Sequence, residues 1–162
     1  MSGMRVGIGQ DSHRFCEGGT EGCILAGVRF NGVPALSANS DGDVVYHALT
    51  NAISGITCSN VLGARADALC RAGITDSAAY VREALDDLSA LGCRLVHLSF
   101  SIECAIPKIT PVIPAMRANL AVLTGLAEGE IGITATTGEG LTDFGRGLGI
   151  QVFCIATAEQ MA

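Results

Sequence analysis

The sequence has no tryptophan, and phenylalanine and tyrosine bring its aromatic content to only 4% of 162 residues. Because hydrophobic residues still make up 49%, a core built from this chain must be aliphatic. Basic residues are also scarce, with 10 lysines and arginines against 16 acidic residues and a formal net charge of −6. General nucleic-acid binding needs a basic surface that displaces phosphate counterions, so this balance argues against it. A small anionic substrate is still compatible with this net charge if a few cations are concentrated in one site.

Paired cysteine motifs and long apolar runs are missing as well. The seven cysteines contain no CxxC pair and are odd in number, so we expect reduced core cysteines rather than a disulfide framework or a cysteine-based zinc site. No run approaches a membrane span, and the N-terminal MSGMRVGIG lacks the long apolar region of a signal peptide. We therefore expect a cytoplasmic protein that contacts no membrane. Its length predicts a single domain over residues 1–162.

Hydrophobic periodicity predicts the order of strands and helices. Alternating or short apolar segments predict strands over residues 4–9, 23–30, 95–104, 130–136 and 148–158. Helical spacing predicts helices over 44–56, 77–91 and 110–124, whereas 57–75 shows no clear pattern beyond one short helix.

This order favours an α/β (α+β) fold, with a mixed four- to five-stranded sheet and helices packed on one face. A doubly wound fold is less compatible with such segregation. Both faces of the segment 148–158 are largely apolar. Since helices would cover only one of them, we expect a neighbouring subunit to cover the other.

Three residues with metal-binding side chains lie near the start of predicted elements. Asp11 and His13 follow the first predicted strand, and in extended backbone two residues that are two positions apart point to the same side. His47 lies one turn into the helix that opens after Ser40-Asp41-Gly42-Asp43. One carboxylate and two imidazoles suit zinc, with a fourth position open for substrate. On these residues alone, an N-terminal turn and an unrelated helix histidine have about equal weight.

Two further clusters carry groups that suit phosphates. Thr136-Thr137-Gly138-Glu139 offers hydroxyls, an amide and a carboxylate that can hold Mg²⁺ between phosphates, ahead of Gly145-Arg146-Gly147. Ala105-Ile106-Pro107-Lys108-Ile109 places a lysine just past a strand end, where it can pair with a phosphate. The alternatives are a flexible hairpin loop in the first case and an exposed loop lysine in the second.

Taken in order, the stretches RVGIGQDSHRF, ANSDGDVVYHAL, IPKITPVIPAMR and ITATTGEGLTDFGRG resemble the 2-C-methyl-D-erythritol 2,4-cyclodiphosphate synthase family. They span nearly the whole chain. The resemblance implies conversion of 4-diphosphocytidyl-2-C-methyl-D-erythritol 2-phosphate to the cyclic diphosphate with release of CMP, in the non-mevalonate isoprenoid pathway. It also implies a homotrimer with sheets facing the threefold axis and active sites between subunits.

The resemblance further assigns roles to residues. Zinc would bind to Asp11, His13 and His47, and Glu139 would hold a second divalent ion, Mg²⁺ or Mn²⁺. Arg146 would lie near a hydrophobic trimer channel, for which an isoprenoid diphosphate is a candidate ligand. The residues expected to bind substrate are Asp11, Ser12, His13, Asn39, Ser40, Cys104, Ala105, Ile106, Pro107, Lys108, Ile109, Thr110, Thr136, Thr137, Gly138, Glu139 and Arg146.

Two of these residues are expected to take part in catalysis, and one of them departs from the family pattern. Thr137 would help to stabilise the transition state. Asn39 stands where the family usually has a histidine, so it can donate a hydrogen bond but carries no charge. The family's ribose-binding aspartate and the FPD segment have no clear equivalent in residues 57–75. Asp143-Phe144 also stands where a Phe-Thr-type pair is usual.

Two rival functions use the same residues. A zinc phosphohydrolase would use the metal to activate water, but no spare histidine or carboxylate is evident as a general base. A trimeric binding protein without turnover is favoured by Asn39 and the altered segment 57–75. It is opposed by the intact set of Asp11, His13, His47 and Glu139.

Overall fold

A four-stranded mixed sheet forms one layer of the computed structural model, which describes residues 3–161. Its strands lie in the order β1 (Met4–Arg14), β6 (Gly149–Gln160), β4 (Cys93–Glu103) and β5 (Ile131–Thr136). Strand β6 is antiparallel to β1 and β4, whereas β4 and β5 are parallel. The predicted mixed sheet is therefore confirmed, with four strands.

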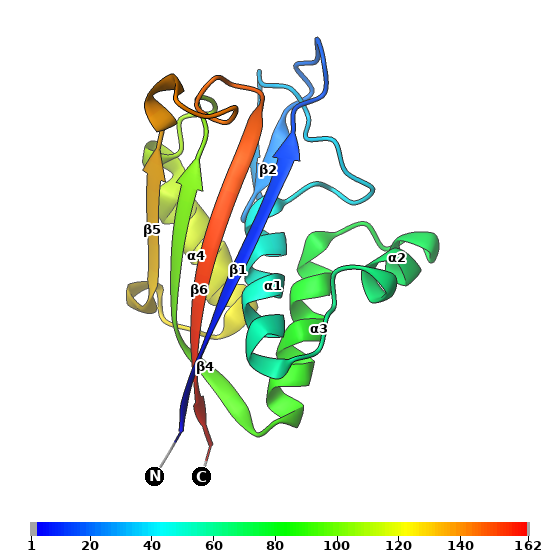
Figure 1. Ribbon diagram of the computed structural model, residues 1–162, viewed down its shortest axis with the longest axis vertical. Helices are drawn as coiled ribbons and strands as arrows, with labels where there is room; N and C mark the ends of the chain where they lie inside the picture. Colours follow the sequence, from blue (N-terminus) through cyan, green and yellow to red (C-terminus); the bar gives the residue numbers. More distant parts are fainter. Residues whose placement is uncertain (1–2, 162) are drawn as a thin grey trace.

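Helices form the second layer, on one face of this sheet (Figure 1). Helix α1 (Val44–Thr57) lies on β1 and β6, α3 (Ser77–Ala90) packs beside α1, and α4 (Ile113–Thr124) lies against β5. Helix α2 (Ala64–Arg71) stands outside the sheet layer, and short 3-10 turns occur at η1 (Thr110–Val112), η2 (Glu128–Glu130) and η3 (Gly138–Gly140). The predicted placement of helices on one face is confirmed.

Glycines in β1 let helix α1 approach the sheet closely. A Cβ atom added to Gly7 would lie 2.0 Å from the carbonyl oxygen of Ala52, and one added to Gly9 would lie 2.0 Å from that of Ala48. Real Cβ atoms do not come so near to backbone oxygens, so only glycine permits this spacing. The backbone of α1 therefore rests directly on β1, and side chains at the start of the helix reach those at the end of the strand.

Asp43 begins helix α1 and also holds a neighbouring hairpin. Its buried carboxylate accepts a hydrogen bond from the backbone N–H of Tyr46 at 3.1 Å, which caps the helix. It also accepts from the N–H groups of Ala26 at 2.9 Å and Gly27 at 2.8 Å. Burial raises the pKa of Asp43 to about 7, although these three donors favour the ionised form. The Asp43 carboxylate thus fixes the N-terminus of α1 relative to the hairpin.

The terminal strand β6 has the two apolar faces that its sequence predicts. Ile150, Val152, Cys154 and Ala156 are fully buried beneath the helices. The opposite face is uncovered in the single chain. Five side chains of β1 and β6 form what we call the outer apolar face, with exposed fractions from 42% to 66%: Met4, Val6, Ile8, Phe153 and Ile155.

Residues 23–30 do not form the single strand that the sequence predicts. They form a hairpin of β2 (Cys23–Leu25) and β3 (Val28–Phe30). Ala26 and Gly27 between them have φ angles of 49° and 71°, a left-handed pair that reverses the chain. The prediction was wrong because the reversal needs only two residues, and one of them is an alanine.

The predicted end of the first strand and the predicted alternation in residues 95–104 also differ from the structure. Strand β1 continues to Arg14 instead of ending at residue 9, because β6 pairs with it as far as Arg14 and Gly149. In β4 the register shifts between Leu95 and His97, so the strict alternation expected from residue 95 begins only after this bulge. Leu95 is buried as a result, while Val96 is only partly covered.

All seven cysteines are free, and four of them are buried: Cys23, Cys93, Cys104 and Cys154. Cys16 and Cys58 are exposed, so the expectation of core cysteines holds for part of the set. Within the described residues, no helix combines the length and apolar character needed to cross a membrane.

Candidate metal centre

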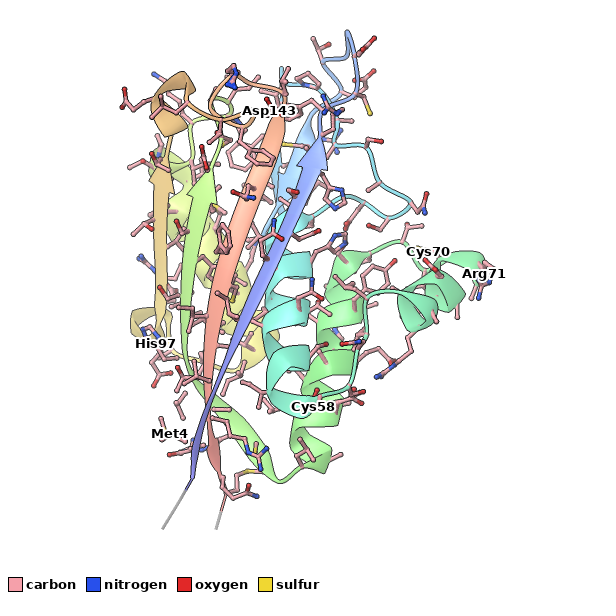
Figure 2. The ribbon with its side chains drawn as sticks, in the orientation of Figure 1. Met4, Cys58, Cys70, Arg71, His97 and Asp143 are labelled. Carbon is pink, nitrogen blue, oxygen red and sulfur yellow. The ribbon has the colours of Figure 1, made fainter. Side chains whose placement is uncertain are left out.

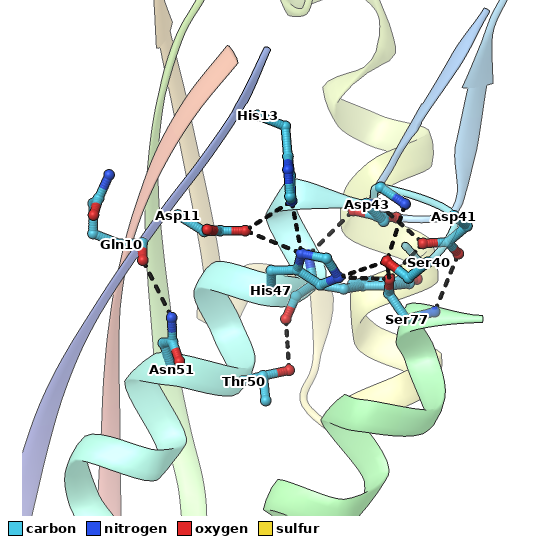
Figure 3. Close-up of polar contacts among 12 residues, drawn as sticks. Gln10, Asp11, His13, Ser40, Asp41, Asp43, His47, Thr50, Asn51 and Ser77 are labelled. Carbon is cyan, nitrogen blue, oxygen red and sulfur yellow. Dashed lines mark hydrogen bonds and ion pairs between the residues drawn. The ribbon is translucent and has the colours of Figure 1, made fainter. Parts of the chain in front are cut away.

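Three side chains from β1 and α1 meet above the end of the sheet. His47 Nδ1 lies 3.0 Å from Asp11 Oδ2 and 3.0 Å from His13 Nε2, and these last two atoms are 3.1 Å apart (Figure 3). Asp11 and His13 point to the same side of β1, as their spacing predicts. His47 is buried, while the other two are partly buried. The three ligand atoms form a nearly equilateral triangle.

This triangle has the size and chemistry of a metal site. Ligand atoms about 2.0–2.1 Å from a tetrahedral ion lie roughly 3.3 Å from one another, close to the separations observed. Each of the three atoms carries a lone pair, and lone pairs packed this closely need a shared positive charge between them. Two imidazoles and one carboxylate are ligands that Zn²⁺ accepts, and they leave one tetrahedral position free. The residues present therefore fit a bound transition metal.

The pKa values of this cluster reflect the same crowding. Burial opposes ionisation of Asp11, yet the neighbouring His13 and His47 imidazoles outweigh it and hold the pKa of the carboxyl well below its ordinary value. The Asp11 carboxylate in turn raises the pKa of His13, against the opposing effect of burial. The carboxylate is thus ionised at neutral pH, as a metal ligand must be.

A small pocket of about 120 Å³ lies beside the triad. His13 and His47 line it, as do Asn39 and Ser40, which the sequence predicts to bind substrate. The remaining lining residues were not predicted: Ala38, Leu62, Ala66, Asp67, Cys70 and Tyr80. Most of them come from α2 and the turn before it. The helical spacing of Ala66, Asp67 and Cys70 puts them on one side of the helix, but only the folded chain shows which side faces the metal ligands.

A second pocket, of about 390 Å³, lies where β4 and β5 end. Most of the predicted residues between 104 and 137 line it, including Lys108 and Thr137. The full lining set is Cys104, Ala105, Pro107, Lys108, Ile109, Thr110, Pro111, Ala135, Thr136 and Thr137. Two elements far apart in the sequence therefore supply one pocket, as the parallel pairing of β4 and β5 requires.

Other predicted residues lie elsewhere in the chain. The side chain of Ser12 is exposed, and alternation along β1 turns it away from Asp11. It lines another hollow, which it shares with the ligand His13 and with Asp143 and Phe144. Glu139 is exposed in η3 with a left-handed φ of 51°. Arg146 is half exposed, 3.8 Å from the Asp143 carboxylate. Ile106 and Gly138 do not line the second pocket either.

The triad and the second pocket lie toward opposite edges of the sheet. The triad belongs to β1, one edge strand, and the second pocket lies at the ends of β4 and β5, on the other side of the sheet. Two strand spacings of about 4.8 Å separate β1 from β4 and three separate it from β5, which amounts to about 10–14 Å. Within one chain, the two groups of predicted residues are not brought together.

Comparisons with known proteins give one consistent result. A family model described as the YgbB family matches residues 4–159. A curated relative from Chlamydia caviae, named 2-C-methyl-D-erythritol 2,4-cyclodiphosphate synthase, is 49% identical over 96% of this chain and 89% of its own length.

Solved structures agree with this match. The structure of the bifunctional IspDF from Campylobacter jejuni superposes on 99% of this chain with a TM-score of 0.90 and 30% identity. This chain spans only 43% of that protein. A structure of 2C-methyl-D-erythritol-2,4-cyclodiphosphate synthase described as the CDP-bound form covers 94% of this chain and 98% of its own, with a TM-score of 0.82 and 30% identity.

We expect His47→Ala to abolish metal binding, because it removes one of three ligands. Wild-type protein should carry one transition-metal ion per chain, and the variant less than about a tenth of that, measured by elemental analysis after dialysis. His97→Ala is the matched control. His97 lies on β4, in the lower part of the view in Figure 2. It pairs with β6 at Thr157, whereas Asp11 pairs at Val152, five residues or roughly 17 Å away along the strand. Unchanged metal content in His47→Ala would contradict the assignment of this site.

Proposed function

Because this chain belongs to the YgbB family, we propose that it converts 4-diphosphocytidyl-2-C-methyl-D-erythritol 2-phosphate to 2-C-methyl-D-erythritol 2,4-cyclodiphosphate and releases CMP. The resemblance to this family, drawn from four motifs, is confirmed by curated relatives at about half identity over most of the chain. The enzyme is then a phosphorus–oxygen lyase of isoprenoid precursor synthesis. The observation that carries the proposal is the converging triad of Asp11, His13 and His47.

We propose zinc as the ion of this triad. Two histidines and one carboxylate match its ligand preference, and a fourth position stays open to a phosphate oxygen. An ion bound there supplies Lewis acidity, which stabilises the negative charge on that oxygen. For the second ion, Mg²⁺ or Mn²⁺, we propose Glu139. A single exposed carboxylate holds such an ion only together with water and substrate phosphates.

The residues of the chain mainly bind and orient the substrate. In the proposed reaction an oxygen of the 2-phosphate forms a bond to the β-phosphorus, and the bond from that phosphorus to the CMP oxygen breaks. The reacting groups belong to one molecule, so holding it in a folded shape lowers the barrier. The CDP-bound relative supports a cytidine ligand, and we propose that the second pocket encloses its cytosine while Lys108 pairs with phosphate oxygens. Thr137 and Asn39 would donate hydrogen bonds to them.

The two separated groups of site residues support a site that two subunits share. We propose a homotrimer in which the outer apolar face is buried around the threefold axis and the second pocket of one subunit meets the triad of another. Exposed apolar side chains on both β1 and β6 form a continuous patch of the kind that marks an interface. We further propose that residues 1–162 act as a single domain, since the family model matches almost all of them.

The reaction is tested by its products. Purified protein incubated with the cytidyl substrate, zinc and Mg²⁺ should release CMP and the cyclic diphosphate in equal amounts, detected by phosphorus NMR. A zinc phosphohydrolase would release CMP and leave an open-chain bisphosphate instead. A protein that only binds would release no CMP. Either of these outcomes would reject the proposed activity.

Glu139→Gln should separate the roles of the two ions. Glutamine keeps the size of the side chain but loses the charge that attracts a divalent cation. We expect zinc content and folding to stay normal, while ring closure falls on the order of a hundredfold, and added Mg²⁺ restores part of the rate. Glu128→Gln, an exposed glutamate of η2, serves as control and should turn over normally. Normal turnover of Glu139→Gln at low Mg²⁺ would remove this residue from the site.

Light scattering tests the assembly, and a trimer should give three times the chain mass of 16.6 kDa. Ile155→Asp places a charge in the outer apolar face and should yield a folded monomer without activity, because the shared site is lost. Val122→Asp is the matched control, since Val122 is an exposed apolar residue of α4 on the opposite layer. It should remain trimeric and active. A wild-type monomer would overturn the shared site.

A further inference from the structure

The ring of His47 contacts polar groups on both sides. Its Nδ1 faces Asp11 and His13, and its Nε2 lies 2.8 Å from the hydroxyl of Ser77 and 3.2 Å from that of Ser40 (Figure 3). Ser77 is fully buried at the start of α3, thirty residues further along the chain. No motif in the sequence points to it. A ligand of the triad is therefore supported by a helix that supplies no ligand itself.

The hydroxyl of Ser77 is in turn bound by Asp41. Ser77 Oγ donates a short hydrogen bond to Asp41 Oδ1, and the Ser77 backbone N–H donates to Asp41 Oδ2 at 3.1 Å. Asp41 Oδ1 also accepts from the N–H of Asp43 at 3.0 Å, which fixes the carboxylate in the loop before α1. Both oxygens of Asp41 are thus occupied by donors, and its orientation is set by two segments at once.

The chemistry of the three groups decides which one donates and which one accepts in each hydrogen bond. An ionised carboxylate only accepts hydrogen bonds, so the single hydroxyl proton of Ser77 points toward Asp41. The Ser77 oxygen then offers a lone pair to His47, and the His47 Nε2 atom must carry the proton of that contact. A neutral imidazole with its proton on Nε2 has a bare lone pair on Nδ1. That is the nitrogen that faces Asp11 and His13.

We propose that Asp41 and Ser77 are positioning residues that hold His47 in the metal-binding tautomer and so set the zinc affinity of the site. In this chain of hydrogen bonds, His47 Nε2–H donates to the Ser77 oxygen and the Ser77 hydroxyl donates to Asp41. Partners that orient a metal-bound histidine typically change metal affinity 10- to 100-fold when removed. Ser40 remains as a longer second acceptor for Nε2, so the loss on removing Ser77 falls within this range and is not complete. The inference rests on the proposed metal site, and not on the reaction.

Zinc affinity of three proteins tests it, measured by competition with a chromophoric chelator. Ser77→Ala should bind zinc 10- to 100-fold more weakly than wild type. Thr50→Val is the matched control, because it also removes a buried hydroxyl, one that donates to the Tyr46 carbonyl in α1 without touching His47. Its affinity should stay within threefold of wild type. Equal affinity of Ser77→Ala and wild type would overturn the positioning role while leaving the proposed function intact. A wild-type protein that binds no zinc would overturn both.

A second measurement starts from the wild-type protein, and its wild-type result tests the proposal even if Ser77→Ala fails to fold. In nitrogen-15 NMR of histidine-labelled wild-type protein, His47 should show a protonated Nε2 whose proton exchanges slowly with water, since it is buried against Ser77. In Ser77→Ala this proton should exchange faster, whereas Thr50→Val should leave it unchanged. A proton on Nδ1, or an Nε2 proton that exchanges as fast as in a free imidazole, would overturn the proposal.

Discussion

The site depends on the close contact between helix α1 and strand β1. Gly7 and Gly9 carry no side chains, so the carbonyl groups of Ala48 and Ala52 rest directly on the strand. Any larger residue would lift the helix and carry His47 away from Asp11 and His13. The glycines are thus as necessary to the triad as the ligands, although they touch no substrate. A metal site built from two elements is only as precise as the packing between them.

The loop that precedes α1 adds a second constraint, because its two aspartates bind different elements. Asp43 binds the first turn of α1 and the turn of the β2–β3 hairpin. Asp41 binds the start of α3 through Ser77. The loop therefore ties the β2–β3 hairpin and α3 to the N-terminal end of the helix that carries His47. Asp43 is buried and Asp41 is partly buried, and backbone and hydroxyl donors satisfy the oxygens of both carboxylates.

The two groups of proposed site residues lie on opposite sides of the sheet. The triad lies on β1, the second pocket lies at the ends of β4 and β5, and the outer face of the sheet is apolar. The proposed trimer would account for both features, because burying the outer apolar face would also bring the sheet edges of neighbouring subunits together. Assembly and substrate binding would then have the same physical origin. In this view Met4, Val6 and Ile8 support the site from a distance.

Much of this protein could be predicted from the sequence. Periodicity predicted α1, α3, α4 and the strands of the sheet, and the two-residue spacing of Asp11 and His13 placed both on one side of β1, because these features depend on local backbone geometry. Four motifs were enough to recognise the family.

The sequence did not predict the reversal at Ala26 and Gly27, the length of β1 or the bulge in β4, since each depends on a pairing partner. Nor did it predict Ser77 or Asp67, whose places beside His47 and in the pocket follow from how α3 and α2 pack against α1. Contacts across thirty residues are decided by packing between elements, and no local spacing encodes that packing.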